Sequence, residues 1–436
     1  MYRKIGPFIK EMLKEDNKIL CIYGARQIGK TYIISKIAKE LFKNYIEINF
    51  DEDNKTDQIF KNVKSIDDFY IQLTAKYGNS IGNKDNTIVF LDEIQVYPQY
   101  FSLLKQLNKD NKYKYICSGS ELGITIKNND GLTPMGSIIE KRMFPMDFEE
   151  FLIANNVGEE AINYLKECFK NRTSVKEEMH NYILKLFKTY LYVGGLPECV
   201  KTYVEEKNVA KIKNIQNTTY KYYSNDAAKY DIENKLKIKT IYKMMLSNMQ
   251  NIVKRIKISS IENKQATYKK YENEFDYLLS SGIALDNKAI SDPKFPLVQS
   301  SSKNLIKLYY NDVGILSELL YKNNINAIIN NDSKINLGSI YETVIAQELI
   351  AHDHQLYYYD RRKVGEVDFL IDDYDNLKII PIEIKSGKTP GIYRALPKLM
   401  TNHSNQISNA YVLSNNNKTI IKNNIIHMPI YNIMFI

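Results

Sequence analysis

The sequence contains no tryptophan, only four cysteines, and no apolar run long enough to span a membrane. Cys21, Cys117, Cys168 and Cys199 are widely spaced and form no CxxC pair, which argues against a zinc ribbon or a dithiol redox motif. A membrane span needs about 18 consecutive apolar residues, and the N-terminus lacks the apolar core of a signal peptide. We therefore expect a soluble, cytoplasmic protein without a membrane partner.

Arginine is also scarce, because 52 of the 60 basic residues are lysines. This skew resembles A/T-rich codon bias, so the net charge of +9 is by itself weak support for an anionic partner. The distribution says more: net charge is +1 over residues 1–155, +8 over 156–335 and zero over 336–436. Codon bias should raise lysine everywhere, so the excess in the middle favours a phosphate-facing role there.

The length of 436 residues, with 44% apolar and 25% charged residues, is typical of a globular protein with roughly two to four domains. The first motif follows an apolar run at residues 19–23 and precedes apolar residues at helical spacing; it is Gly24-Ala25-Arg26-Gln27-Ile28-Gly29-Lys30-Thr31. This G-x-x-x-x-G-K-T pattern between a strand and a helix binds nucleotide phosphates through backbone N–H groups. Lys30 can reach the terminal phosphates, and the Thr31 hydroxyl can ligate Mg²⁺. We expect all eight residues to form an ATP site.

Two further strands are expected to end beside this loop. Residues 87–91 form a continuous apolar run that ends in Asp92 and Glu93 and resembles Walker B. We expect Asp92 to hold Mg²⁺ and Glu93 to act as the general base that polarises the attacking water. The strand at 113–117 ends in Ser118-Gly119-Ser120, which resembles the sensor-1 position of AAA+ ATPases. Both Ser118 and Ser120 are candidates, and a plain turn is the alternative for either.

Residues 20–200 resemble a bacterial and archaeal family of AAA+-superfamily P-loop ATPases. The resemblance is carried by GARQIGKT, VFLDEIQ (89–95), the Ser-Gly-Ser strand end, FPMDFEEFL (144–152) and YLYVGGLPECV (190–200). It implies ATP and Mg²⁺ as cofactors and a C-terminal domain of uncharacterised function. It also implies an arginine supplied in cis or by a neighbouring copy of a homo-oligomer. Arg142 is the best-placed candidate, and structural pairing with Glu140 or Asp147 is the alternative.

The middle of the chain is predicted to be mainly helical, with a break at Gly194-Gly195-Leu196-Pro197. A helical stripe over 238–253, an amphipathic helix over 266–279 and a β segment led by Gly282 resemble a winged helix-turn-helix. That fold often reads DNA, and Lys264, Tyr268, Lys269 and Lys270 would then face phosphate. Such modules also serve as interaction lids in ATPases, so both interpretations stay open.

Three segments of residues 336–436 carry acids in a fixed order. Glu342 lies on a predicted helix, Asp368 on a strand, and Glu383 and Lys385 on one face of the next strand. The acids can bind Mg²⁺, and the lysine can position water for phosphodiester hydrolysis. The arrangement resembles the PD-(D/E)xK nuclease superfamily, which implies that Asp368 and Glu383 are metal ligands and that Glu342 is the additional acid of the resolvase-like branch. The alternative is a degenerate fold that only binds.

These patterns predict an α/β protein in four segments. They are a parallel-sheet P-loop ATPase core of the AAA+ type (1–155), a helical extension (156–230), a winged-helix-like linker (231–335) and a restriction-endonuclease-like α/β domain (336–436). The favoured function is an ATP- and Mg²⁺-dependent ATPase that gates DNA binding or cutting by the nuclease-like domain. The alternatives are an ATP-dependent DNA-binding switch with an inactive nuclease fold, and an ATPase that acts with partner proteins and no nucleic acid.

Overall fold

The computed structural model describes residues 1–15, 17–78, 81–120, 136–226, 235–251, 254–256, 258, 261, 268–322, 324–330, 337–385 and 394–436. The chain forms two compact units. The first comprises residues 1–144 and 280–282, and the second comprises residues 145–279 and 283–436. Within the described ranges, none of the helices combines the length and the apolar character that a membrane crossing requires.

The first unit contains a parallel five-stranded sheet in the order β2-β3-β4-β1-β5. Its strands are β1 (Ile19–Tyr23), β2 (Asn44–Asn49), β3 (Thr87–Asp92), β4 (Lys114–Gly119) and β5 (Ile138–Arg142). The chain leaves β1 towards β2 on one side, and it leaves β4 towards β5 on the other side. The carboxyl ends of β1 and β4 therefore lie at a topological switch point, where open α/β sheets bind their ligands.

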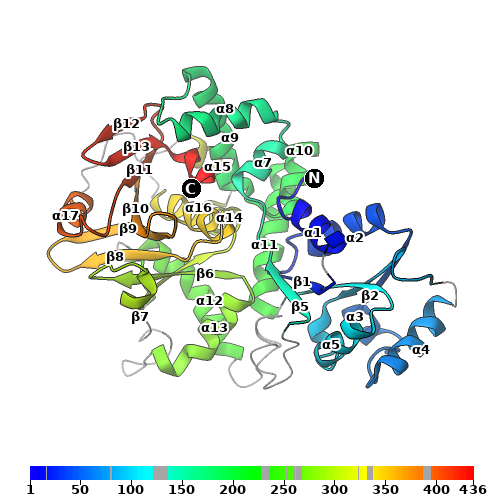
Figure 1. Ribbon diagram of the computed structural model, residues 1–436. Helices are drawn as coiled ribbons and strands as arrows, with labels where there is room; N and C mark the ends of the chain where they lie inside the picture. Colours follow the sequence, from blue (N-terminus) through cyan, green and yellow to red (C-terminus); the bar gives the residue numbers. More distant parts are fainter. Residues whose placement is uncertain are drawn as a thin grey trace. The chain divides into compact units, whose positions relative to one another are not determined.

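Helices cover both faces of this sheet (Figure 1). On one face, α1 (Ile5–Glu15) contacts α2 (Lys30–Leu41) and β1; the other face is covered by α3 (Phe50–Lys55), α4 (Ile66–Tyr77) and α5 (Tyr100–Asp110). Side chains alternate along a strand, so apolar runs such as β3, buried throughout, fill both interfaces. The parallel-sheet core predicted from the sequence is confirmed.

One contact within this sheet could not be predicted from the spacing of the cysteines. Cys21 on β1 and Cys117 on β4 are opposite each other in the parallel register, and their sulfur atoms form a disulfide across 96 residues of sequence. Both side chains are fully buried. Only the strand order, which inserts β4 beside β1, brings these two cysteines together.

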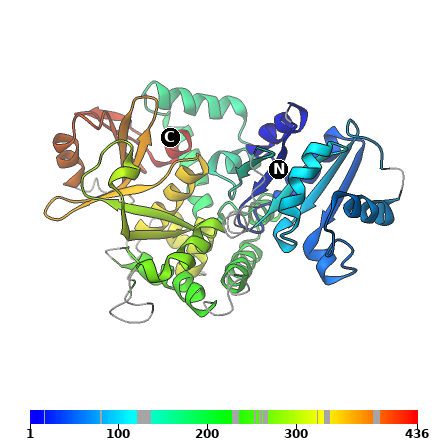
Figure 2. The same ribbon diagram turned by 60° about the horizontal axis from the view of Figure 1, so that its bottom comes forward.

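The second unit contains an eight-stranded mixed sheet in the order β12-β13-β11-β10-β9-β8-β6-β7 (Figure 2). Its strands are β6 (Ala284–Ile290), β7 (Ser302–Tyr310), β8 (Tyr357–Arg361), β9 (Gly365–Asp373), β10 (Lys378–Lys385), β11 (Ala410–Ser414), β12 (Ile420–Lys422) and β13 (Ile425–Pro429). Strand β6 pairs in parallel with β8 and antiparallel with β7. The predicted linker segment therefore contributes two strands to the sheet of the C-terminal segment.

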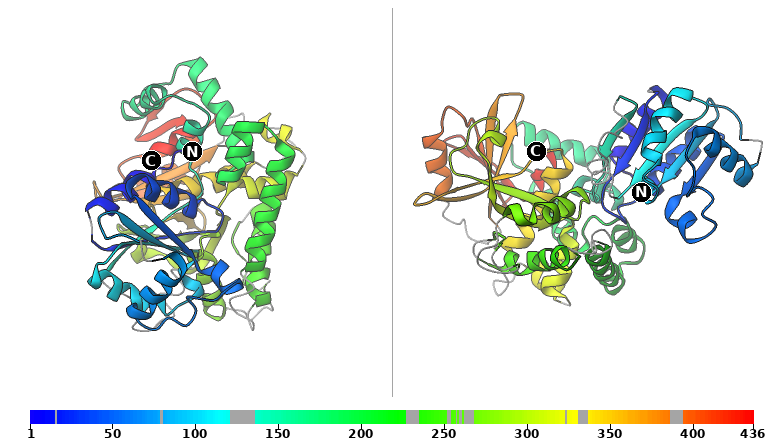
Figure 3. Two further views of the ribbon diagram at one scale, coloured as in Figure 1. Left: turned by 90° about the vertical axis from the view of Figure 1, so that its right-hand side faces the viewer. Right: turned by 90° about the horizontal axis from the view of Figure 1, so that it is seen from below.

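Helices of the second unit pack around this sheet. They are α7 (Phe148–Ala154), α8 (Glu159–Lys170), α9 (Glu177–Val193), α10 (Pro197–Glu206), α11 (Val209–Asp226), α12 (Lys235–Gln250), α13 (Glu272–Ser280), α14 (Val313–Tyr321), α15 (Ile325–Ile329), α16 (Gly338–Ala351) and α17 (Ala395–Asn402), with short 3-10 turns at η3 (Tyr268–Tyr271), η4 (Leu297–Ser300) and η5 (Ile430–Phe435). Helices α11 and α12 run side by side (Figure 3), and α16 contacts β6, β7 and β10. Helix α16 therefore lies against both the linker strands and the C-terminal strands.

The Gly194-Gly195 turn is held by the buried carboxylate of Asp312, which precedes α14. Asp312 Oδ2 accepts a hydrogen bond from Gly195 N at 2.6 Å, and its Oδ1 accepts one from Ile315 N at 3.1 Å. A Cβ atom on Gly194 would lie 2.2 Å from Asp312 Oδ1, and one on Gly195 would lie 2.0 Å from the carbonyl oxygen of Met146. Both glycines of the YLYVGGLPECV segment are therefore required by packing.

The FPMDFEEFL segment is fixed by α16. Glu348 Oε1 accepts hydrogen bonds from Phe148 N at 2.9 Å and from the Tyr190 hydroxyl at 3.2 Å. The same hydroxyl oxygen lies 2.5 Å from the carbonyl oxygen of Met146, so its single proton is shared between these two acceptors. These contacts place both family-specific segments in the structural core of the second unit. The first unit ends at Phe144, so most of the FPMDFEEFL segment belongs to the second.

The Asp312 carboxylate predicts a pH dependence of stability. Burial raises the pKa of Asp312 from 3.8 to about 6, although hydrogen bonds from Gly195 N and other backbone N–H groups lower it. The folded chain therefore holds this proton more tightly than the unfolded chain. The protonated Asp312 side chain therefore contributes about 3 kcal/mol to the free energy of unfolding. This contribution is complete below pH 3.8 and is lost as the pH rises through 6. As the pH rises from 4 to 7, the free energy of unfolding of wild type, measured with urea, should fall relative to that of Asp312→Asn. A constant difference between the two proteins over this range would contradict the prediction.

Candidate functional site

The loop between β1 and α2 has the backbone geometry of a phosphate-binding loop. Gly24 and Gly29 have φ values of 146° and 89°, in the region that favours glycine. A Cβ atom on Gly24 would lie 2.2 Å from the carbonyl oxygen of Met143, which follows the neighbouring strand β5. Helix α2 begins at Lys30, so its N-terminal N–H groups and its partial positive charge face the loop. A side chain in place of Gly24 would therefore clash with the backbone that follows β5.

The charged side chains of the loop lie at this helix terminus. Lys30 is only 5% exposed, and its Nζ atom donates to the carbonyl oxygens of Gly24 and Ala25, at 2.9 Å each. The Thr31 hydroxyl donates to Asp92 Oδ2 at 2.9 Å. The two side chains that we predicted as Mg²⁺ ligands therefore touch each other, across 61 residues of sequence.

Asp92, at the end of β3, is the centre of this network. It is 2% exposed, and it accepts hydrogen bonds from Ser118 and, at 3.3 Å, from Asn49 Nδ2. Burial raises the pKa of Asp92, as does the charge of Glu93, while the hydrogen bonds from Ser118 and Thr31 lower it. Asn49 was not predicted from the sequence. It is opposite Asp92 in the register between β2 and β3, and the carboxyl ends of neighbouring parallel strands meet at one edge of the sheet.

The two serines at the end of β4 contact different acids. Ser118 binds Asp92, whereas the Ser120 hydroxyl donates to Glu93 Oε2 at 3.3 Å. The same carboxylate oxygen accepts a hydrogen bond from Gln95 Nε2 at 2.5 Å. Gln95 was part of the VFLDEIQ segment, but the sequence analysis assigned it no role. All three polar contacts lie at the carboxyl edge of the sheet, where the attacking water of an ATPase would be bound.

Arg142 lies at the same edge. It is opposite Tyr23, the last residue of β1, in the register between β1 and β5. Its guanidinium group lies 5.0 Å from the centre of the Phe144 ring. The strand register therefore places Arg142 beside the residue that precedes the P-loop.

In the second unit, a β-bulge places Asp368. Tyr357 of β8 pairs with Leu370, and Tyr359 pairs with Val367, so β9 contains one extra residue between these pairs. Bulges bend a strand and re-aim the side chains of the residues in it. Asp368 is one of the two residues in this bulge, and its Oδ2 accepts a hydrogen bond from Ile384 N at 2.8 Å. The bulge thus joins Asp368 to β10 between Glu383 and Lys385.

The four predicted nuclease-like residues come together around this point. Lys385 Nζ donates to Glu383 Oε1 at 2.7 Å. Burial, followed by the charges of Glu383 and Glu342, raises the pKa of Asp368 well above its usual value. Burial also raises the pKa of Glu383, against the opposing effect of Lys385. The hydrogen bond from Ile384 N to Asp368 and the ion pair between Lys385 and Glu383 thus place Asp368 and Glu383 on neighbouring strands, and the charge of Glu342 on α16 acts on both of their pKa values.

Two lysines of the linker segment complete the cluster, and the sequence analysis missed both. Lys254 forms an ion pair with Glu342, and Lys307 of β7 pairs with Glu366 and lies 3.9 Å from Glu342 Oε2. The Tyr309 hydroxyl donates to Glu342 Oε2 at 3.1 Å. Burial acts to raise the pKa of Glu342, but Lys307, Lys254 and Tyr309 together lower it. Glu342 is therefore ionised in this site.

Both acid sites suit Mg²⁺ by the chemistry of their donors. Among the described residues, no three His, Cys, Asp or Glu side chains form a metal-binding group, so each site offers fewer protein ligands. Mg²⁺ is commonly held by one or two carboxylates, with water or phosphate oxygens as its other ligands. Thr31 and Asp92 fit this pattern. Asp368 and Glu383 fit it too, because Glu383 Oε2 is buried without a hydrogen-bond partner.

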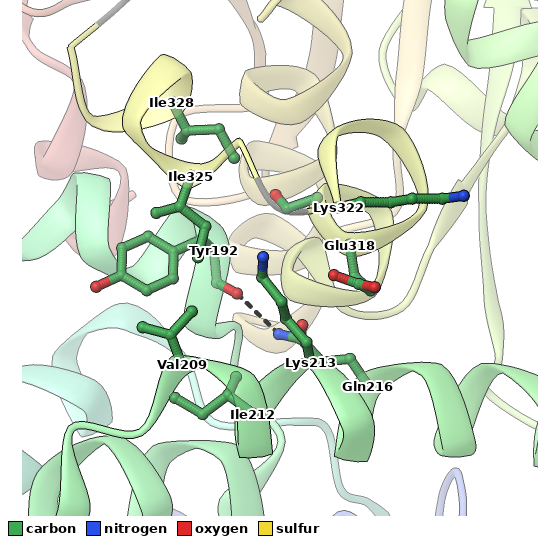
Figure 4. Close-up of a pocket in the computed structure, with 10 residues that line it drawn as sticks. Tyr192, Val209, Ile212, Lys213, Gln216, Glu318, Lys322, Ile325 and Ile328 are labelled. Atoms are coloured by element: carbon green, nitrogen blue, oxygen red, sulfur yellow. Dashed lines mark hydrogen bonds between the residues drawn. The ribbon is translucent and has the colours of Figure 1, made fainter.

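A pocket in the second unit does not compete with these sites. It is lined by residues of α9, α11, α14 and α15 and their ends, among them Tyr192, Ile212, Glu318 and Ile328 (Figure 4). Gln216 donates to the carbonyl oxygen of Tyr192 at its edge, at 2.8 Å. Its volume of about 10 Å³ is the space of about one water molecule. The pocket is therefore too small for an organic ligand.

Comparison with known proteins agrees with the first site. Residues 16–152 match the family model of an AAA domain. Together with the P-loop, the Walker B acids and the parallel sheet, this match defines a P-loop ATPase domain of the AAA type. The protein is an ATP-hydrolysing enzyme. Residues 184–326 and 337–433 each match a domain of unknown function, DUF8612 and DUF4143.

Individual proteins are similar to this chain over much of its length. The uncharacterized protein MJ1544 of Methanocaldococcus jannaschii is 24% identical over 359 residues, which are 81% of this chain and 72% of that protein. The Walker-type ATPase PABY2304 of Pyrococcus abyssi has a TM-score of 0.43 and 14% identity, over 73% of this chain and 95% of that chain. The Aeropyrum pernix ORC2 protein, in its ADPNP–ADP complexes, has a TM-score of 0.34 and 12% identity, over 76% and 93%. The ATPase assignment depends on the family model and the site.

Lys30→Ala should abolish ATP hydrolysis. The ammonium group of Lys30 is the buried cation at the loop, and loss of such a group at a developing phosphate charge costs ~100-fold or more in rate. Steady-state phosphate release measures the effect. Lys36→Ala, the same substitution at an exposed position of the same helix, is the control and should retain wild-type turnover. Normal turnover by Lys30→Ala would contradict the Walker assignment.

Proposed function

We propose that this ATPase acts on DNA and that ATP gates Mg²⁺-dependent phosphodiester cleavage at Asp368, Glu383 and Lys385. The observation that carries the proposal is the set formed by two buried carboxylates, Glu342 and Glu383, the half-buried Asp368 in the bulge of β9, and Lys385. Buried carboxylates are costly unless they are paired or bind a metal, so such a cluster is more typical of a functional site than of a structural core.

Each residue has a role that follows from its contacts. Asp368 and Glu383 would hold Mg²⁺, which supplies Lewis acidity towards the phosphodiester and a more acidic bound water. Lys385 pairs with Glu383 and retains 20% of its side-chain surface, so it can face the scissile phosphate. Glu342 is held in its ionised form by Lys254 and Lys307, and we assign it the role of keeping the cluster negative. The order α16–β8–β9–β10–α17–β11 brings these residues together.

DNA is the proposed partner because of where the positive charge lies. Residues 235–290 carry eleven basic and five acidic residues. Lys269 and Lys270 are exposed on η3, directly before α13, and β6 and β7 follow α13 as the β segment of the proposed winged helix. Lys264 lies outside the described residues. Tyr268 is buried and stacks on Phe275, with ring centres 5.1 Å apart, so it supports the core instead of facing phosphate.

Two further assignments accompany this proposal. A cytoplasmic location fits an enzyme whose proposed substrates, ATP and DNA, are found there. A homo-oligomer in which Arg142 completes a neighbouring nucleotide site fits the position of Arg142 at the carboxyl edge of the sheet.

One observation favours a second candidate function, an ATP-dependent DNA-binding switch with an inactive nuclease fold. Lys254 and Lys307 occupy both carboxylate oxygens of Glu342, and the described residues lack a three-ligand metal group. In that case DNA would bind without being cut. An ATPase that acts only with partner proteins would neither bind nor cut DNA. The two experiments below separate the three functions.

Asp368→Asn should lower the rate of metal-dependent cutting by ~100-fold or more, because it removes a metal-binding charge from the site. The assay incubates supercoiled plasmid with protein, ATP and Mg²⁺, and it follows nicked and linear products. Asp373→Asn, on the same strand at the hairpin end, is the matched control and should cut normally. ATP hydrolysis should be unchanged in both variants. Cutting that survives Asp368→Asn would contradict the nuclease assignment, and binding without cutting by wild type would favour the switch.

Replacing Lys269 and Lys270 together with alanine should weaken DNA binding. Each lysine that contacts a phosphate adds about 0.9 to the slope of log K against log salt, so the slope should fall by about two. Fluorescence anisotropy of labelled duplex DNA at several salt concentrations measures it. The control replaces Lys418 and Lys422, two exposed lysines of the neutral C-terminal segment. ATP hydrolysis without DNA should not change; an equal loss in both double variants would mean that η3 is not the binding surface.

A further inference from the structure

We propose that Gln95 is a positioning residue of ATP hydrolysis, which orients Glu93 with one end of its amide and holds the attacking water with the other. This inference depends on the ATPase site alone and is independent of the proposed action on DNA. It concerns a residue directly after the Walker B acids that no comparison assigns.

The backbone after β3 is shaped to bring Gln95 back over Glu93. Glu93 has φ 54° and ψ 46°, a left-handed conformation that non-glycine residues adopt rarely and that clusters at functional sites. The next residues form the 3-10 turn η1 (Ile94–Val96), closed by a hydrogen bond from Val96 N to the carbonyl oxygen of Glu93 at 3.0 Å. This turn allows residues 93 and 95 to meet through their side chains.

The direction of the Gln95 amide follows from its neighbours. An ionised carboxylate only accepts hydrogen bonds, so the amide NH₂ group must face Glu93 Oε2, at 2.5 Å. The same nitrogen lies 3.2 Å from the Ser120 hydroxyl, which itself donates to Glu93. These contacts fix both the carboxylate of Glu93 and the plane of the amide. The other end of the amide, Oε1, is thereby turned away from Glu93 Oε2.

The oxygen at that other end indicates the ligand. Gln95 is 7% exposed, and its Oε1 atom is buried without a hydrogen-bond partner among the described residues. A buried amide oxygen without a donor is costly, so a donor is expected there. A water molecule is the smallest such donor, and in the proposed arrangement it is the water that Glu93 activates. A glutamine orients the attacking water in the same manner in other P-loop enzymes that hydrolyse nucleotides.

The alternative is that Gln95 only stabilises the turn. The two roles differ in kinetics. A group that holds the attacking water acts in the chemical step, so its loss lowers kcat and leaves ATP binding unchanged. A group that only supports the fold affects ATP binding and thermal stability, and its effect does not depend on the presence of Glu93.

The central test is Gln95→Leu, which keeps the side-chain volume and removes both hydrogen-bonding ends. We expect kcat to fall at least ~10-fold, with KM for ATP within about twofold of wild type. Gln99→Leu, at the start of α5, where the amide donates to the Lys61 carbonyl oxygen, is the matched control and should turn over normally. In the Glu93→Gln background, Gln95→Leu should lower kcat less than ~3-fold, because the base that activates the water is already absent. An unchanged kcat, or the same fold loss in both backgrounds, would overturn the proposal.

A second variant keeps the test decisive if leucine prevents folding. Gln95→Asn keeps both ends of the amide but shortens the side chain by one methylene group, so the amide cannot reach Glu93 and the water together. We expect kcat to fall at least ~10-fold, with KM for ATP and the melting temperature close to those of wild type. A kcat equal to that of wild type would contradict the inference.

Discussion

Burial of carboxylates is the constraint on which both units depend. The buried acids among the described residues include Asp92, Asp312, Glu342, Glu348 and Glu383, and Asp368 is half-buried. A buried carboxylate without donors costs several kcal/mol, so each fixes the segments that supply its hydrogen bonds. Asp92 fixes the P-loop and β4, Asp312 fixes the glycine turn, and Glu348 fixes the start of α7. The positions of these acids explain why segments far apart in sequence pack as they do.

Helix α16 shows how this constraint links motif and site within the second unit. Near its start, Glu342 meets Lys254 and Lys307 of the linker segment. One and a half turns later, Glu348 binds Phe148 and Tyr190, which belong to the two family-specific segments. Those segments are therefore tied to the same helix as the acid cluster. These contacts show that part of their distinctive sequence serves the packing of the second unit.

The parts that could be predicted from the sequence are those set by short spacing. The P-loop and the Walker B acids each lie within a strand and its next turn, where periodicity and residue type suffice. Asn49, Lys254 and Lys307 were missed because they reach their sites through strand register or long-range pairing. The same holds for the bulge at Asp368 and for the pairing of β6 with β8. Tyr268 was predicted to be exposed, because composition alone cannot show which tyrosine of a lysine-rich segment is buried.

The lysines of the two sites differ in whether they can leave their present partners to bind a phosphate. Lys30 is held by two neutral carbonyl oxygens, which are weaker acceptors than a phosphate, so a nucleotide can take over its hydrogen bonds. Lys307 is 1% exposed and paired with carboxylates, and withdrawing it would leave buried charges uncompensated. It can therefore set the charge of the acid cluster but cannot move to a substrate. Of the described lysines that pair with Glu342 or Glu383, Lys385 keeps the largest exposed fraction of its side chain, so it is the one best placed to reach a phosphate.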